Sequence, residues 1–168
     1  MKNIYDLKHL INIQIPNGKT IIYDFLITFA RFECALKNTS RFLHPNEAEP
    51  AWDTFADSIS LVFNPDSSLK TRNAVDYILN DPPRKQINEL GVLIWQDNIL
   101  SDENSITRKL SVYIRRVRNN LLHGGKFNGS YTPESRNHQL IISSLIILND
   151  WVNLDPELKS NFLADINP

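Results

Sequence analysis

Five basic or titratable side chains lie within the stretch RRVRNNLLHGGKF at residues 115–127, namely Arg115, Arg116, Arg118, His123 and Lys126. A guanidinium keeps its charge and can bind two phosphate oxygens at once. An imidazole, with a pKa near ~6.5, can accept and return a proton around neutral pH. Arg118 and His123 could therefore act together on a phosphodiester, with the amide of Asn119 orienting one of them. This stretch also fits a solvent-exposed helix end, because cations complement the partial negative charge there.

Helical geometry separates the two principal candidates. At about 100° per residue, Arg118 and His123 lie about 140° apart around one helix. They could meet through the reach of the arginine, through a change of direction at the adjacent glycines, or across a twofold dimer that brings two copies of each to one cleft. An apolar stripe of this helix is predicted to face the core and consists of Ile106, Leu110, Tyr113, Ile114, Val117 and Leu121. A neighbouring, outward strip consists of Arg115, Asn119, Leu122 and His123, and the apolar Leu122 in it favours a contact with a second copy.

Glu33 is the second unusual residue, because it lies in the apolar stripe of a predicted helix. A carboxylate loses its hydration in such a place, at considerable cost unless a positive charge is paired with it. Arg115 or Arg118 is the natural partner, and Arg72 is an alternative. We interpret Glu33 as a residue that holds an arginine in place.

The elements that must position these residues are predicted to be helices. Helical periodicity predominates over strict alternation, which predicts a single all-α domain with a helical-bundle architecture. Residues 1–18 are expected to form an N-terminal extension, 19–155 the main bundle, and the last residues a short tail. The three tryptophans are expected in the core. The predicted helices cover about 19–37, 49–63, 68–79, 101–123 (capped by Ser101 or Asp102) and 133–154, with 85–100 helical in part.

Composition limits the classes of function. With 168 residues, 42% of them hydrophobic and 22% charged, the chain is typical of a globular domain. No apolar run is long enough to cross a membrane, and the first residues lack the pattern of a secretion signal, so a cytoplasmic location is expected. The single cysteine, Cys34, is expected to be a buried thiol. Residues 101–136 carry a net charge of +4 and the rest of the chain −5, which suits a polyanionic ligand.

Metal and cofactor chemistry are not predicted. The histidines at 9, 44, 123 and 138 have no spacing typical of paired metal ligands, and no cluster of carboxylates resembles a two-metal nuclease. The HGGKF sequence lacks the preceding strand and the following Ser or Thr of a phosphate-binding loop. We therefore expect neither a metal nor a cofactor.

Three segments together resemble the HEPN family. RNNLLH at 118–123 resembles its signature, in which an arginine, a polar residue and a histidine follow at similar spacing. FARFECALKN at 29–38 resembles the aromatic-Arg-x-Glu-x-x-Leu-Lys helix of small members, and DPPRKQ at 81–86 continues the match. The resemblance spans about residues 23–151.

This resemblance implies an all-helical, dimer-forming domain, which in many members is a metal-independent endoribonuclease of defence, toxin–antitoxin or RNA-processing systems. It implies that Arg118 and His123 are catalytic, with Asn119 as the polar residue of the motif. Arg115, Arg116 and Lys126 are expected to contact the RNA backbone or to be ordinary surface charges. Some toxin members have a tyrosine two residues after the histidine, where this chain has Gly125.

The expected partners are RNA, a second copy of the chain and an antitoxin or other regulatory protein, without a membrane. Two other functions remain open from the sequence. One is a catalytically inactive module that binds RNA or a nucleotide through the basic residues of the stretch at 115–127. The other is a helical interaction or scaffold subunit.

Overall fold

The computed structural model describes residues 19–101, 104–123 and 135–164. Within these ranges the chain is mostly helical, as predicted, but it also contains a two-stranded antiparallel sheet, so the all-α prediction was too simple. A short 3-10 turn, Ser40–Phe42, follows the first helix. The elements are α2 (Lys19–Asn38), α3 (Trp52–Ser58), α4 (Leu69–Asn80), β1 (Lys85–Glu89), β2 (Val92–Gln96), α5 (Ile106–His123), α6 (Arg136–Val152) and α7 (Pro156–Leu163).

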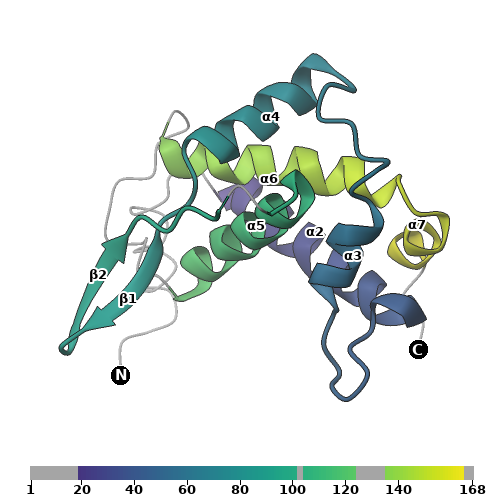
Figure 1. Ribbon diagram of the computed structural model, residues 1–168, viewed down its shortest axis with the longest axis horizontal. Helices are drawn as coiled ribbons and strands as arrows, with labels where there is room; N and C mark the ends of the chain where they lie inside the picture. The colour runs from purple at the N-terminus through teal and green to yellow at the C-terminus, as the bar shows by residue number, and fades with distance from the viewer. Residues whose placement is uncertain (1–18, 102–103, 124–134, 165–168) are drawn as a thin grey trace.

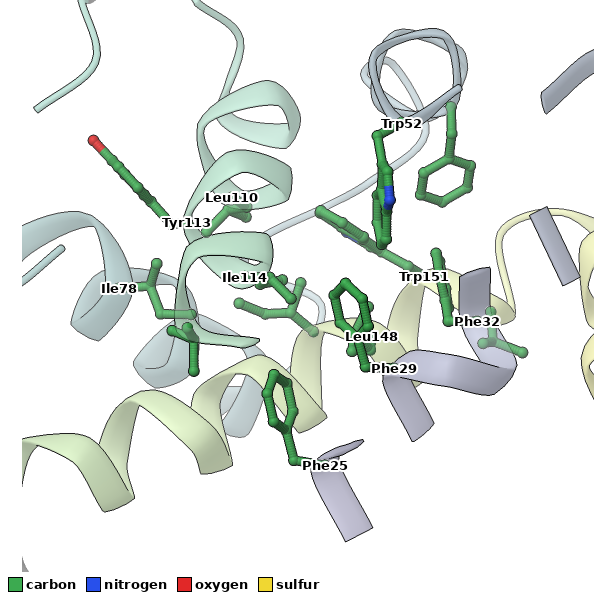
Figure 2. Packing of buried hydrophobic residues seen from close by; sticks show 14 of the residues in the cluster. Phe25, Phe29, Phe32, Trp52, Ile78, Leu110, Tyr113, Ile114, Leu148 and Trp151 are labelled. Atoms are coloured by element: carbon green, nitrogen blue, oxygen red, sulfur yellow. The ribbon is translucent and has the colours of Figure 1, made fainter. Parts of the chain in front are cut away.

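Helix α6 lies at the centre of the bundle and packs against α2 and α4, with α5 crossing nearby (Figure 1). Its apolar residues between Leu140 and Val152 are buried on several sides of the helix. The interior is rich in aromatic rings, and Figure 2 shows Phe29, Phe32, Trp52 and Trp151 gathered in it. Helix α7 packs against α2, so the predicted short tail is instead part of the bundle.

Helix boundaries depend on capping groups that the sequence shows only in part. Ser68 caps α4 by accepting a hydrogen bond from the Thr71 N–H, close to the predicted start. The predicted cap of α5 at Ser101 or Asp102 was wrong: α5 begins at Ile106, and Ser105 Oγ accepts the Arg108 N–H at 3.2 Å. Asp102 itself lies outside the described residues.

The predicted helix at 49–63 is much shorter than expected, since α3 covers only Trp52–Ser58. Leu43 and Pro50 form an isolated antiparallel bridge, in which the Ala51 N–H donates to the Phe42 carbonyl at 2.7 Å. Because the backbone is extended at this bridge, α3 begins only after it, at Trp52. Pro50 therefore lies before the helix and not in its first turn.

The segment 85–100, predicted to be helical in part, forms the hairpin of β1 and β2 instead. Leu90 and Gly91 make the turn with φ values of 51° and 88°, and the Gly91 N–H donates to Asn88 Oδ1 at 2.8 Å. Positive φ at both central residues is the geometry of a tight hairpin turn, which a helix cannot accommodate. The hairpin projects from one end of the bundle (Figure 1).

Three burial predictions were wrong. Cys34 is exposed on α2, Ile106 is 44% exposed at the first position of α5, and Trp95 is 37% exposed on β2. The other residues of the predicted apolar stripe of α5 are buried. Among the described residues, no helix combines the length and apolar character needed to cross a bilayer.

Candidate functional site

A groove of about 830 Å³ opens between α2, the segment before α3, the start of β1 and α5. Its lining contains five cationic side chains and two carboxylates, so its charge favours an anion. Four of the predicted site residues from α5 and the predicted Glu33 meet there. The charged lining residues are Lys37, Lys85, Arg115, Arg116, Arg118, Glu33 and Glu49, and Asn119 and Asn120 also line the groove.

Arg118 is held by contacts with α2. Its Nη2 lies 3.2 Å from Glu33 Oε1 and 3.5 Å from Oε2, and its guanidinium carbon lies 4.9 Å from the centre of the Phe29 ring. About a quarter of each charged side chain is exposed, which strengthens their attraction relative to a pair in water. The predicted pairing of Glu33 with Arg115 or Arg118 is confirmed for Arg118. The alternative was wrong, because Arg72 pairs with Asp66.

Trp52 also contacts Glu33, although the sequence predicted only that Trp52 is a core residue. Its ring stacks on Phe29 and Phe32 at 5.5 and 5.4 Å, while its Nε1–H donates to Glu33 Oε1 at 3.1 Å. A buried indole usually has a partner for its N–H, which is the one signal that could have pointed to a polar neighbour. Glu33 is therefore fixed from the core side by Trp52 and from the groove side by Arg118.

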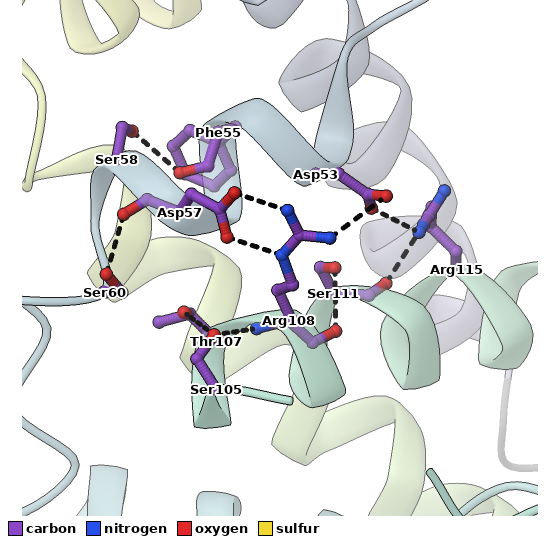
Figure 3. A network of polar contacts seen from close by, with 10 residues as sticks. All are labelled: Asp53, Phe55, Asp57, Ser58, Ser60, Ser105, Thr107, Arg108, Ser111 and Arg115. Atoms are coloured by element: carbon purple, nitrogen blue, oxygen red, sulfur yellow. Dashed lines mark hydrogen bonds and ion pairs between the residues drawn. The ribbon is translucent and has the colours of Figure 1, made fainter. Parts of the chain in front are cut away.

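Arg115 belongs to a second network, which joins α3 to α5 (Figure 3). Its Nη2 lies 3.5 Å from Asp53 Oδ1, and its Nε donates to the Ser111 carbonyl at 3.3 Å. Asp53 also lies 3.5 Å from Arg108, which binds Asp57 through two nitrogens. These hydrogen bonds lower the pKa of the Asp57 carboxyl.

The guanidinium of Arg115 lies among charges of both signs. Burial is the main cause that lowers its pKa, the charges of Asp53 and Glu33 raise it, and the charge of Arg118 lowers it by a smaller amount. Arginine nevertheless stays protonated at physiological pH. A bound anion in the groove would attract both guanidiniums, because Arg115 and Arg118 both line it.

Arg116, which was predicted to contact RNA, makes hydrogen bonds within the chain. Its Nη1 donates to the carbonyls of Pro83 and Asn98 at 3.0 and 2.8 Å, and its Nη2 donates to Asn98 Oδ1 at 2.8 Å. Asn120 Nδ2 donates to the Arg84 carbonyl at 2.8 Å. These contacts attach both ends of the hairpin to α5, so Arg116 is a structural anchor at the wall of the groove.

The remaining predicted residues are described unevenly. Asn119 is exposed at the groove, and Leu122 is 50% exposed on α5, as expected for an outward position. Helix α5 extends as far as His123, whose side chain lies outside the described part of the structure, as does all of Lys126.

No protein-family model, curated protein or solved structure matches the chain.

Replacing Glu33 with alanine is expected to lower the free energy of unfolding by about 1–3 kcal/mol, because a half-buried guanidinium and an indole N–H both lose their acceptor. Urea denaturation measures this difference. Glu33→Gln should cost less, since an amide oxygen can still accept from Trp52. The matched control is Asp66→Ala, which breaks the exposed pair with Arg72 and should change stability by at most about 1 kcal/mol. Equal effects of the two alanine variants would contradict the proposed support of Arg118.

Proposed function

We propose that this protein is a metal-independent endoribonuclease of the HEPN type, in which Arg118 and His123 act on one phosphodiester and Asn119 assists them. The observation that carries the proposal is the placement of Arg118. It is fixed by Glu33 and Phe29 at the edge of a basic groove, and it is followed on the same helix by Asn119 and, at the helix end, His123. A guanidinium already oriented in this way needs little reorganisation as negative charge develops on a phosphate.

A second copy of the chain is part of the proposal. Because α5 remains helical through His123, residues 118 and 123 start about 140° apart around its axis. Two copies related by a twofold axis would place the arginine of one near the histidine of the other, as a self-complementary interface requires. The exposed Leu122 lies on α5 directly before His123 and is an apolar residue suited to such a contact.

The proposed reaction uses the 2′-hydroxyl of RNA as the nucleophile. The 2′-oxygen forms a bond to phosphorus as the bond from phosphorus to the 5′-oxygen breaks. His123 accepts the proton of the 2′-hydroxyl and, once protonated, donates a proton to the departing 5′-oxygen. Arg118 stabilises the charge on the phosphoryl oxygens. The products are a 2′,3′-cyclic phosphate and a 5′-hydroxyl.

A binding module for RNA or a nucleotide is the second candidate function. It is favoured by the groove being formed within one copy of the chain, and by the engagement of Arg118 with a carboxylate of the same chain. Such a module would bind phosphate through Arg115 and Arg118 without cleaving it.

The proposal is tested by incubating the purified protein with total RNA in EDTA and analysing the new ends. Cleavage is expected to continue without divalent metal and to leave 2′,3′-cyclic phosphates. Contaminating ribonucleases can leave the same ends, so the control is the Arg118→Ala/His123→Ala protein purified identically, which should produce none. A strict requirement for Mg²⁺, or equal cleavage by the double variant, would exclude this mechanism. Binding of RNA without any cleavage would favour the second candidate.

A further inference from the structure

The hairpin of β1 and β2 is exposed on both faces. Most of its side chains are accessible, and Trp95, at 37% exposure, contrasts with the buried Trp52 and Trp151, at 4% and 0%. An isolated two-stranded hairpin is marginally stable in water, so its position must be fixed by contacts at its base. An exposed indole at a fixed position is a platform that a ligand can use.

The base of the hairpin is held firmly on α5. Arg116 binds carbonyls on both sides of it, and Arg84 and Asp97 form an ion pair of 2.9 Å where its two strands begin and end. Asn120 adds a hydrogen bond to the Arg84 carbonyl. Since Arg116 and Asn120 also line the groove, the hairpin and the groove share one rigid support.

Trp95 lies one strand away from the wall of the groove. In the strand register it pairs with Gln86, and Gln86 and Lys85 both line the groove. Directly opposed residues of an antiparallel pair point to the same face, and neighbouring strands lie about 4.8 Å apart. Trp95 therefore shares a face with Gln86 and lies one strand spacing away from this lining residue, whereas Lys85 points to the other face of the hairpin.

We propose that Trp95 stacks on an unpaired base of an RNA strand whose phosphates lie in the basic groove. This inference rests on the proposed function only in taking RNA as the ligand, and it adds a binding residue on an element outside the Arg118 and His123 site. Basic grooves with an adjacent aromatic platform bind single-stranded nucleic acid, because every base presents a π face while the cations track the backbone.

The charge of the groove favours a nucleic acid over a second protein as the occupant. Lys37 and Lys85 line the groove, and within the described ranges neither ammonium group has an acceptor. Arg115 and Arg118 also line the groove, and each is paired with one carboxylate, Asp53 and Glu33 respectively. A polyanion would compensate these charges together, whereas the exposed Leu93, on the same face as Trp95, would suit either occupant.

The test uses the emission of tryptophan, because Trp95 is the accessible indole and the other two are buried. An eight-nucleotide single-stranded RNA with 2′-O-methyl groups, which cannot be cleaved by 2′-hydroxyl attack, is titrated into the protein. Quenching is expected in the wild type. Trp95→Leu should lose the quenching and bind a labelled copy of this RNA about 5- to 150-fold more weakly, the range that corresponds to stacking of one base. Trp95→Phe, which keeps an aromatic ring, should stay close to the wild-type affinity.

The matched control is Val92→Ala, which removes an exposed apolar side chain from the opposite face of β2 and should leave RNA affinity unchanged. Wild-type affinity in Trp95→Leu would overturn the inference. So would a loss of self-association in Trp95→Leu without a loss of RNA affinity, since the hairpin would then be a contact between copies. If the protein binds no RNA, both this inference and the proposed function fail. If Trp95-dependent binding occurs without cleavage of natural RNA, only the nuclease proposal fails.

Discussion

Alanine at Arg118 is expected to lower the rate of RNA cleavage by about 10²–10³-fold, the effect typical of removing one group that stabilises the charge of the transition state. The side chain is already oriented before substrate binds, by Glu33 at 3.2 Å and by the face of Phe29. Its removal therefore deletes a preorganised charge. Single-turnover cleavage of a labelled oligonucleotide at saturating protein measures the chemical step separately from binding.

Two further variants make this prediction specific. Arg118→Lys keeps the charge but loses the planar, forked donor set, so we expect most of the activity to remain absent. Arg72→Ala removes an arginine that also forms an ion pair with a carboxylate, but on α4 and outside the groove, and it should cleave at the wild-type rate. Cleavage by Arg118→Ala within a few-fold of the wild type would remove Arg118 from the proposed mechanism.

The helices with a clear apolar stripe could be predicted from the sequence, whereas the hairpin could not. Helices α2, α4, α5 and α6 each bury one stripe of side chains or more. Apolar residues therefore recur along their sequences with the period of an α-helix. The strands β1 and β2 bury neither face, and therefore show no alternation between apolar and polar residues. The turn also uses Leu90 at positive φ, where sequence statistics favour asparagine or glycine.

The candidate site was predictable where burial creates an electrostatic requirement. A carboxylate in an apolar stripe needs a cation, and this indicated that Glu33 pairs with an arginine, with Arg115 or Arg118 preferred and Arg72 as the alternative. The partners of Arg116 could not be predicted, because they are backbone carbonyls of Pro83 and Asn98 in a hairpin that the sequence did not reveal. The same missed hairpin led to the prediction that Trp95 is buried.

The aromatic core is expected to control the stability of the site. Phe55 is fully buried on the short helix α3, and its ring contacts the rings of Phe32, Phe42, Trp52 and Trp151 at centroid distances of 5.3–6.4 Å. Phe55→Ala should lower the free energy of unfolding by about 3–5 kcal/mol, because it removes a large buried ring and leaves a cavity among rigid neighbours. Chemical denaturation followed by circular dichroism measures the difference.

The control for Phe55→Ala is Leu61→Ala, whose side chain is 97% exposed and whose loss should change stability by no more than about 0.5 kcal/mol. Similar denaturation midpoints for Phe55→Ala and Leu61→Ala would contradict the prediction that Phe55 contributes strongly to stability. Because Trp52 lies on α3 and donates to Glu33, loosening α3 should also release the carboxylate that orients Arg118. Phe55→Leu, which keeps most of the volume, should therefore cleave RNA more slowly than the wild type even under conditions where it remains folded.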